Sequence, residues 1–391
     1  MENFIFNIPT RAYFGKGQIE NLASGVKEFG GSRVLLTYGG GSIKSNGIYQ
    51  AVIDQLNGAG IFYIELSGIK PNPPIEDVYE GVRLMKENNL DFIVAVGGGS
   101  ALDAAKAIAA GAKYDGDVFD LISGKVAVND ATPLATVLTM AGTGSELDMG
   151  GVITVGENHK KYAIIHPLLN PKFSILDPEY TFTVNEHHSM AGCSDILSHL
   201  MEQYLRPDIG CDVPDRMNEG IMKVVLDNAP KIKENPNDYI ARANIMWASS
   251  MALAGFQFMM GKKFGAFPVH AMGHELSSLN DMTHGVTLAL ITPSWMRYTL
   301  KNAPEFTPMF ARFARNIFEI LETDDVKAAN EGIEKLEHFY EIIGMPKNMR
   351  EAGVSEDELK YLADKATEFG DIGTMTPITK TEALEIYTMA W

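Results

Sequence analysis

The segment Asp91-Phe-Ile-Val-Ala-Val96 is followed directly by Gly97-Gly-Gly-Ser100 and then by Ala101-Leu-Asp-Ala-Ala-Lys-Ala-Ile-Ala-Ala110. The first part is a short apolar run of the kind found in strands that are buried on both faces. The last part is rich in alanine, which is the best helix former. This order predicts a strand, a tight glycine turn and a helix, the unit from which parallel α/β sheets are built.

The same unit recurs on both sides of this segment. Upstream, the apolar run 33–38 ends in Gly39-Gly-Gly-Ser42, and a helical pattern over 43–57 leads to a second strand at 61–65. Downstream, Leu134-Ala-Thr-Val-Leu138 ends in Thr139-Met-Ala-Gly-Thr-Gly-Ser-Glu146. Alternation of strands and helices indicates a mostly parallel sheet with helices on both faces.

The pattern changes near residue 186. Strand-like alternation disappears, and long helical patterns follow, for example over 215–228, 307–321 and 326–343. We therefore expect two domains: an α/β dinucleotide-binding domain over residues 1–187 and an all-α metal and substrate domain over residues 188–391, with the site in the cleft between them.

Glycine-rich turns at the ends of parallel strands are suited to binding the phosphates of a cofactor. Glycine lets the backbone approach a pyrophosphate closely, and free N–H groups at a helix start favour anions. The GxGxxG fingerprint of dinucleotide sites is absent, and a single GGGS turn is as often a plain tight turn. Three such turns form a stronger pattern. The cofactor contacts expected from this pattern and its neighbourhood are Gly39, Gly40, Gly41, Ser42, Gly97, Gly98, Gly99, Ser100, Asp103, Thr139, Thr143 and Lys161.

Two of these residues have alternative interpretations. Asp103 lies in the first turn of its helix and could cap that helix instead of contacting a sugar hydroxyl. Lys161 could instead belong to a solvated hairpin, because Gly156-Glu-Asn-His-Lys160 resembles a turn.

The first glycine turn bears on the choice of cofactor. NAD sites commonly place a carboxylate against the ribose 2′-hydroxyl near a strand end. No Asp or Glu occurs from Val34 through Lys44, and the small residues with Ser42 and Lys44 leave room for a 2′-phosphate. The sequence favours NADP(H) over NAD(H).

A cluster of histidines indicates a metal site in the C-terminal half. His270 and His274 are four residues apart and would share one helical face, and His284 follows ten residues later. Asp195 and His199 have the same four-residue spacing upstream. Two helices could thus direct one carboxylate and two or three imidazoles to a common point, as at a divalent transition-metal site. A single histidine is more often a hydrogen-bonded core or surface residue, and the clustering does not decide which of these are ligands.

Composition excludes several classes of protein. The 391 residues include 33 basic and 50 acidic side chains, which argues against nucleic acid or an anionic membrane as a partner. Two cysteines provide no disulfide framework. No apolar run approaches the length of a transmembrane helix, and the N-terminus is too broken for a signal peptide. A cytoplasmic enzyme acting on a small molecule fits these observations.

Four motifs in this order resemble the iron-containing, or group III, alcohol dehydrogenase family, and most closely its NADPH-dependent butanol dehydrogenase and broad aldehyde reductase branch. The motifs are Gly97-Gly-Gly-Ser-Ala-Leu-Asp-Ala-Ala-Lys106, Thr139-Met-Ala-Gly-Thr-Gly-Ser-Glu146, Ala191-Gly-Cys-Ser-Asp-Ile-Leu-Ser-His199, and His270-Ala-Met-Gly-His-Glu-Leu276 with His284-Gly285.

The resemblance implies a ligand set and an oligomer. Asp195, His199, His270 and His284 would bind the metal, and His274 would stand beside it. The family's metal would be Fe²⁺, with Zn²⁺ or Co²⁺ as alternatives that ligand chemistry alone does not separate. A homodimer is also implied, paired near Phe4 to Ile8.

The expected reaction is the interconversion of short-chain primary alcohols and aldehydes of the butanol and butanal type, with aldehyde reduction as the expected direction. His274 is the candidate proton relay, because a histidine titrates near working pH. Aromatic and methionine side chains between Phe256 and Phe267 would suit a small apolar substrate.

Two other functions are alternatives. A metal-dependent lyase of the dehydroquinate-synthase type would need a basic pocket, for which the metal region offers few cations. A non-catalytic regulator would not need an open metal beside a nicotinamide.

Overall fold

The computed structural model describes residues 3–156, 160–207, 210–254 and 267–391. The chain forms two compact units. The α/β unit contains residues 7–184 and 249–254, and the helical unit contains the described residues among 1–6, 185–248 and 255–391. The two expected domains, residues 1–187 and 188–391, stay a prediction, because contacts within the chain do not test whether each part folds independently.

A six-stranded parallel sheet is the centre of the α/β unit. Its strand order is β1-β8-β5-β4-β2-β3, and every neighbouring pair is parallel. The sheet strands are β1 (Arg11–Phe14), β2 (Arg33–Tyr38), β3 (Phe62–Ser67), β4 (Phe92–Gly97), β5 (Leu134–Leu138) and β8 (Phe173–Leu176). The mostly parallel sheet expected from the strand–helix alternation is confirmed.

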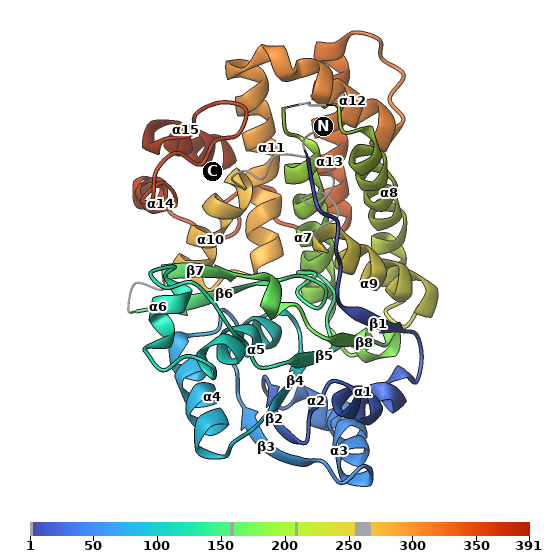
Figure 1. Ribbon diagram of the computed structural model, residues 1–391. Coiled ribbons are helices and arrows are strands. Elements are labelled where there is room, and N and C mark those ends of the chain that lie inside the picture. The colour runs from blue at the N-terminus through green and yellow to red at the C-terminus, as the bar shows by residue number, and fades with distance from the viewer. Residues whose placement is uncertain (1–2, 157–159, 208–209, 255–266) are drawn as a thin grey trace. The chain divides into compact units, whose positions relative to one another are not determined.

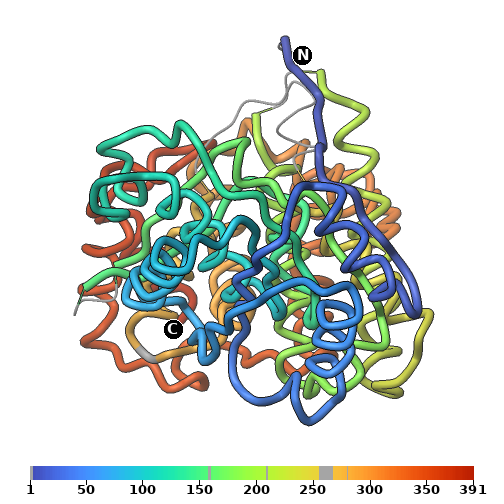
Figure 2. Tube along the Cα trace, turned by 60° about the horizontal axis from the view of Figure 1, so that its bottom comes forward, coloured from blue at the N-terminus to red at the C-terminus, as the bar shows by residue number. Residues whose placement is uncertain are grey.

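Helices cover both faces of this sheet (Figure 1). Buried side chains of three helices pack on one face against Val34, Val94 and Val137; these helices are α1 (Leu22–Glu28), α2 (Ser42–Ser45) and α3 (Ile48–Gly58). The other face is packed by α4 (Ile75–Glu87) and α5 (Gly99–Gly111), and α6 (Val118–Ile122) follows α5. In the second view the blue segments that carry α1 to α4 come forward (Figure 2).

Two details of this unit differ from the sequence pattern. The single helix expected over 43–57 is two helices, because Gly47 between them has a φ of 85°, a left-handed conformation that interrupts a helix. The segment after β5 forms an antiparallel hairpin, β6 (Gly150–Val155) and β7 (Lys160–Ile165), outside the main sheet.

The helical unit has no strand among its described residues. Its α-helices are α7 (Glu186–Tyr204), α8 (Asp212–Glu234), α9 (Tyr239–Leu253), α10 (Pro268–Asn280), α11 (His284–Asn302), α12 (Thr307–Phe318), α13 (Asp325–Ile342), α14 (Leu359–Ala366) and α15 (Lys380–Ala390), with the last residues of α9, from Ser249, counted in the α/β unit. The all-α character expected for the C-terminal part is confirmed for the residues described. None of the helices described has the length and apolar character needed to cross a membrane.

Candidate active site

The three glycine-rich turns lie next to one another at one edge of the sheet. They follow β2, β4 and β5, which are consecutive in the strand order. The chain passes from β2 outward to β3 and then returns to the opposite side of β2 as β4, so the order reverses between β2 and β4. Such a reversal is where open α/β sheets bind ligands.

The turn after β4 is packed closely against the loop after β5. A Cβ on Gly99 would lie 2.6 Å from Cγ2 of Thr143, so a side chain at that position would displace the loop. The Thr139 N–H donates to the Gly97 carbonyl over 3.0 Å. The structure thus brings together the cofactor residues expected at β4 and β5, while their contact with a cofactor stays a prediction.

Asp103 and Lys106 on α5 fix the start of the β6 strand. The Asp103 carboxylate accepts hydrogen bonds from Ser145 Oγ over 2.7 Å and from the Val152 N–H over 2.9 Å. Lys106, buried to 0% exposure, donates to Ser145 Oγ over 2.9 Å and forms an ion pair with Asp148. Burial raises the pKa of Asp103 to about 6. Asp103 therefore has structural bonds whether or not it also reaches a sugar.

Lys161 lies on β7 and donates from Nζ to Asn72 Oδ1 over 2.9 Å. Asn72 has a φ of 51°, so the bond ties the hairpin to a turn that is held in a left-handed conformation. A cofactor role for Lys161 stays a prediction.

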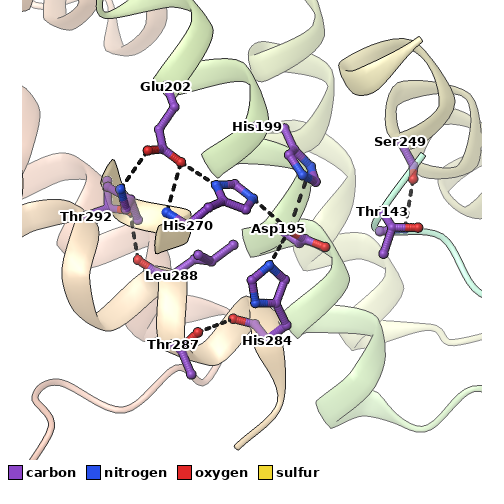
Figure 3. Close-up of polar contacts among 12 residues, drawn as sticks. Thr143, Asp195, His199, Glu202, Ser249, His270, His284, Thr287, Leu288 and Thr292 are labelled. Carbon is purple, nitrogen blue, oxygen red and sulfur yellow. Dashed lines mark hydrogen bonds and ion pairs between the residues drawn. The ribbon is translucent and has the colours of Figure 1, made fainter. Parts of the chain in front are cut away.

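The predicted metal ligands come from three helices of the helical unit. Asp195 and His199 lie on α7, His270 lies on α10, and His284 is the first residue of α11. The chain turns back between α10 and α11 at Asp281, whose φ of 51° ends α10. Figure 3 shows the three histidine side chains pointing toward Asp195.

Three imidazole nitrogens surround one carboxylate oxygen. Asp195 Oδ1 lies 3.7 Å from His199 Nδ1, 3.6 Å from His270 Nε2 and 3.9 Å from His284 Nε2. These distances exceed those of hydrogen bonds. They are close to the separation of about 3.4 Å between ligand atoms in a tetrahedral site with metal–ligand bonds of 2.0–2.2 Å.

Burial makes this arrangement costly without a partner for its polar atoms. Asp195 is 4% exposed and His199 7% exposed. Asp195 Oδ1, His199 Nδ1 and His270 Nε2 are buried and lack a hydrogen-bond partner among the described residues. Unsatisfied buried polar atoms are rare in native proteins and call for an explanation such as an ion. Asp195, His199 and His270 present atoms within 4.8 Å of one another, which a single cation could bind.

The charges in the cluster are interdependent. Burial alone would raise the pKa of Asp195, but the imidazoles of His199, His270 and His284 hold it well below its ordinary value. Burial lowers the pKa of His199 to about 4, so this imidazole is neutral near pH 7 and has a lone pair for a metal.

Glu202 is a residue of this site that the sequence analysis missed. It is 2% exposed, and its carboxylate accepts the N–H groups of Val269 over 2.7 Å and His270 over 3.3 Å at the start of α10. It also bonds His270 Nδ1, which leaves Nε2 facing Asp195 (Figure 3). The spacing of Glu202 from Asp195 and His199, seven and three residues, places all three on one face of α7 and could have revealed it.

Glycines bring the three helices close together. A Cβ on Gly285 would lie 1.8 Å from the Ala191 carbonyl oxygen, so α11 starts in backbone contact with α7. A Cβ on Gly273 would lie 2.8 Å from Thr287 Oγ1, so α10 and α11 are also in close contact. This packing sets the position of His284 relative to Asp195.

His274 lies beside the cluster. Its ring is stacked on His284 with centroids 4.9 Å apart, and its centroid is 6.3 Å from that of His270. Most of the segment expected to line a substrate pocket, from Phe256 to Phe264, lies outside the described residues. Phe267 is described, and its ring meets His270 edge-on.

The donor set fits a divalent transition metal. Three imidazoles and one carboxylate match the nitrogen and oxygen ligands of Fe²⁺, Zn²⁺ and Co²⁺. Glu202 bonds the ring nitrogen of His270 that faces away from Asp195, and metal-bound histidines usually have such a carboxylate partner, which fixes the orientation of the ring.

Models of protein families match almost the whole chain. The model described as iron-containing alcohol dehydrogenase matches residues 9–178, and the C-terminal model of the Fe-containing alcohol dehydrogenase family matches residues 189–391.

Similar proteins match over their full lengths. The chain is 40% identical over 394 residues to NADH-dependent butanol dehydrogenase A of Clostridium acetobutylicum, covering 100% of both chains. It is 34% identical over 398 residues to the NADPH-dependent aldehyde reductase YqhD of Escherichia coli, again covering 100% of both. A crystal structure of NADH-dependent butanol dehydrogenase A from Thermotoga maritima matches with a TM-score of 0.94 and 35% identity, over 100% of this chain and 99% of that one.

Proposed function

The chain belongs to the iron-containing alcohol dehydrogenase family, and on this premise we propose that it reduces short-chain aldehydes such as butanal with NADPH, at a divalent metal bound by Asp195, His199, His270 and His284. It is an oxidoreductase that interconverts alcohols and aldehydes with a nicotinamide cofactor, and the family implies a divalent metal, iron.

The observation that carries the ligand assignment is the position of Asp195 Oδ1, 3.6–3.9 Å from one nitrogen of each of three histidines. A cation at their centre would satisfy the buried atoms that lack hydrogen bonds among the described residues. Fe²⁺ is the proposed ion, with Zn²⁺ and Co²⁺ as competent alternatives.

The residues of the chain have separate parts in the reaction. A cation bound at the cluster supplies Lewis acidity, which polarises the oxygen of the substrate. Asp195 provides the one negative charge within the ligand set, so the complex retains a net positive charge. Glu202 holds His270 with Nε2 directed to the cluster, and the neutral His199 offers its lone pair without first losing a proton.

His274 is the proposed group that exchanges a proton with the substrate oxygen. Its ring is stacked on that of His284, with centroids 4.9 Å apart, and its centroid is 6.3 Å from that of His270, so it lies beside the proposed ligands. Replacing His274 with Phe should therefore lower turnover while the metal content stays at the wild-type level. Loss of the metal in this variant would make His274 a ligand and contradict the assignment.

The ligand assignment is tested by measuring bound metal in single variants. Asp195→Asn, His199→Ala, His270→Ala and His284→Ala should each lose metal and activity together. His338→Ala is the matched control, since His338 lies on α13 with its side chain 66% exposed. Full metal occupancy in any of the four variants would remove that residue from the ligand set.

The cofactor proposal favours NADP(H). It is supported by the lack of any Asp or Glu from Val34 through Lys44, the stretch that contains the turn after β2. The relatives differ, because the butanol dehydrogenases are named NADH-dependent and the aldehyde reductase is named NADPH-dependent. The ratio of kcat/KM for NADPH and NADH tests the proposal, and a ratio below one would reverse it.

The substrate proposal rests on the names of the relatives together with the apolar segment before His270. Two similar proteins from Clostridium acetobutylicum are named butanol dehydrogenases. A panel of aldehydes and alcohols, compared by kcat/KM in both directions, should rank butanal above polar aldehydes and above butanol. The comparisons give no support to the lyase alternative.

We also propose a homodimer. Apolar side chains near the N-terminus are exposed in the single chain: Phe4 is 47% exposed, Ile5 86% and Phe6 47%. Covering such side chains is a common reason for association. Light scattering should give twice the chain mass for the wild type and one chain mass for Ile5→Lys; a monomeric wild type would contradict the proposal.

The proposed location is the cytoplasm. Cys193 and Cys211 are both buried and do not form a disulfide with each other, as expected of a protein that works where thiols stay reduced. Cell fractionation with an antibody to the chain tests this, and recovery outside the cytoplasm would refute it.

A further inference from the structure

A buried carboxyl group lies in the loop after β5, and the proposed function does not use it. Glu146 is 0% exposed and ends the segment 139–146, which carries the proposed cofactor contacts Thr139 and Thr143. The Glu146 carbonyl accepts a hydrogen bond from Ser174 Oγ on β8 over 2.6 Å. All of these residues belong to the α/β unit. The backbone of Glu146 is thus held on the sheet, while its side chain is enclosed by the protein.

Among the described residues, the Glu146 carboxyl group has one side-chain donor for its two oxygens. Ser250 Oγ, on α9, donates to Oε1. Oε2 is buried and lacks a partner in the part of the chain that the structure describes. As a neutral acid, Glu146 leaves one hydroxyl group unpaired, whereas an ionised carboxylate would leave a charge in the interior with a single side-chain donor. The neutral acid is therefore the form that fits this site.

The charges around Glu146 do not offset a charge on its carboxylate. In the described part of the chain, the surrounding elements contribute Lys106 and Asp103 from α5 and Asp148 from the loop, whereas β5, β8 and the end of α9 contribute no charged side chain. Lys106 attracts a carboxylate here, but its three N–H groups already donate to Asp148 and to two other oxygen atoms. Burial, together with repulsion by Asp148, raises the pKa of Glu146 to about 7. The group therefore changes its charge close to neutral pH.

The loop that ends in Glu146 is held from two sides. On one side, the Thr143 side chain packs closely on the turn after β4. On the other, the Gly142 N–H donates to Ser249 Oγ over 2.8 Å, and Figure 3 shows the Ser249 side chain directed at this loop. A Cβ on Gly144 would lie 2.8 Å from the Ser249 carbonyl oxygen, so the loop and α9 are in backbone contact. The same turn of α9 carries the donor to Glu146, so a movement of Glu146 away from α9 would also move Thr143 off the turn after β4.

We propose that Glu146 is a positioning residue for the nicotinamide cofactor, and this rests on the proposed function, which assigns cofactor contacts to Thr139 and Thr143. As the neutral acid, Glu146 holds the loop on α9 and Thr143 against the turn after β4. When its proton passes to solvent, the charged carboxylate must reach water, so the loop moves off α9 and the cofactor binds less tightly. Because such coupling is reciprocal, bound cofactor keeps Glu146 protonated to a higher pH. The enzyme thereby binds its cofactor most tightly on the acid side of neutrality.

Binding of NADPH tests this without turnover. The fluorescence of the bound nicotinamide is measured with metal-loaded enzyme and no aldehyde, from about pH 6 to about pH 8.5, on either side of the expected transition. The Kd of wild type should rise about fivefold over this range, the low end for coupling between two sites. Glu146→Gln should keep nearly the same Kd throughout, because the amide stays neutral and its oxygen still accepts from Ser250. NADH should give the same two results, since it differs from NADPH in the 2′-phosphate alone.

Two further variants separate this role from a structural effect on the loop. Ser250→Ala removes the donor that stabilises the ionised carboxylate, so the midpoint of the rise in Kd should move up by about one pH unit. A merely structural role of this bond would raise Kd at every pH and leave the midpoint unchanged. Glu20→Gln is the matched control, because Glu20 is exposed, lies in the same unit and precedes α1, and it should show the wild-type dependence. Asp103 and the cofactor phosphates titrate in all of these proteins, so their effects cancel in the comparison.

The outcomes separate this inference from the proposed function. If Kd changes with pH by the same factor in wild type and Glu146→Gln, or if Ser250→Ala leaves the midpoint in place, Glu146 has no such role, although aldehyde reduction stands. If the pH dependence of Kd follows Glu146 and Ser250 as described but no aldehyde is turned over with either cofactor, the proposed function fails and the role of Glu146 holds.

Discussion

Replacing Gly285 with Ala should separate α11 from α7 and weaken metal binding at the proposed site. The added Cβ would lie 1.8 Å from the Ala191 carbonyl oxygen and 2.5 Å from its carbon, both backbone atoms of α7 that no side-chain rotation can move. Contacts below 3.0 Å are essentially never found for Cβ atoms, so the helices must move apart by about 1.2 Å.

This displacement is large compared with what a metal site tolerates. His284 precedes Gly285 directly, and its Nε2 is already the most distant of the three nitrogens, 3.9 Å from Asp195 Oδ1. Metal–ligand distances vary by about 0.2 Å, so His284 would leave the ligand set. Overpacking of this kind lowers the free energy of unfolding by about 3 kcal/mol. For a domain of the size of the helical unit, this lowers Tm by about 6–12 °C.

The assay is thermal unfolding by circular dichroism, combined with metal analysis of the same samples. Gly220→Ala is the matched control: Gly220 lies on α8 in the same unit, and a Cβ there meets nothing within 4 Å. That control should leave Tm unchanged or raise it slightly. Wild-type Tm and metal content in Gly285→Ala would refute the account of how the helices position His284.

Three further predictions concern buried carboxylates and an ion pair. Glu202→Gln should lower metal affinity by about 10–100-fold with little change in Tm, measured by competition with a chelator, because it weakens the bond that orients His270; unchanged affinity would contradict this role. Burial raises the pKa of Glu146 to about 7, above its value in the unfolded chain, so its contribution to stability is greatest below pH 4.5 and is lost as pH rises to about 7. Urea unfolding at several pH values should show that, between pH 4.5 and 7, the free energy of unfolding falls by up to about 3 kcal/mol more in the wild type than in Glu146→Gln. An equal fall in the two proteins would contradict this role of Glu146. Lys106→Met should cost about 3 kcal/mol in urea unfolding, because it leaves the carboxylate of Asp148 without its buried partner; a cost below about 1 kcal/mol would show that the pair is not stabilising.

Local patterns predicted much of the α/β unit. The apolar runs before each glycine turn became β2, β4 and β5, since a short β-branched or apolar run between a helix and a glycine turn has few alternatives. Side-by-side placement of the turns followed from parallel pairing. The break at Gly47 was missed because a glycine inside a helical pattern is often tolerated, and its φ depends on tertiary packing.

The convergence of Asp195 with three histidines was predicted in part. Spacing placed Asp195 and His199 on one helical face, but it did not select among the possible ligands; the proposed ligand set was implied by the resemblance to a family. The spacing of Glu202 could have placed it on the same helical face, but not shown what it bonds, because its partner, His270, is 68 residues away.

Long-range contacts also define the α/β unit. Residues 249–254 belong with residues 7–184, and the Ser249 and Ser250 side chains bond Gly142 and Glu146, more than 100 residues away in sequence. No periodicity in the sequence of α9 signals these bonds. Partners that are distant in sequence are therefore the part of the fold that required the structure.

We propose that aldehyde reduction depends on a metal held by the buried cluster around Asp195. The most direct measurement is the initial rate of NADPH oxidation with butanal by metal-stripped enzyme, before and after addition of Fe²⁺, Zn²⁺ or Co²⁺, for wild type and His199→Ala in parallel. We expect no rate before addition, recovery with at least Fe²⁺ in the wild type, and no recovery in the variant. Full activity of the stripped wild type, or equal recovery in His199→Ala, would contradict it.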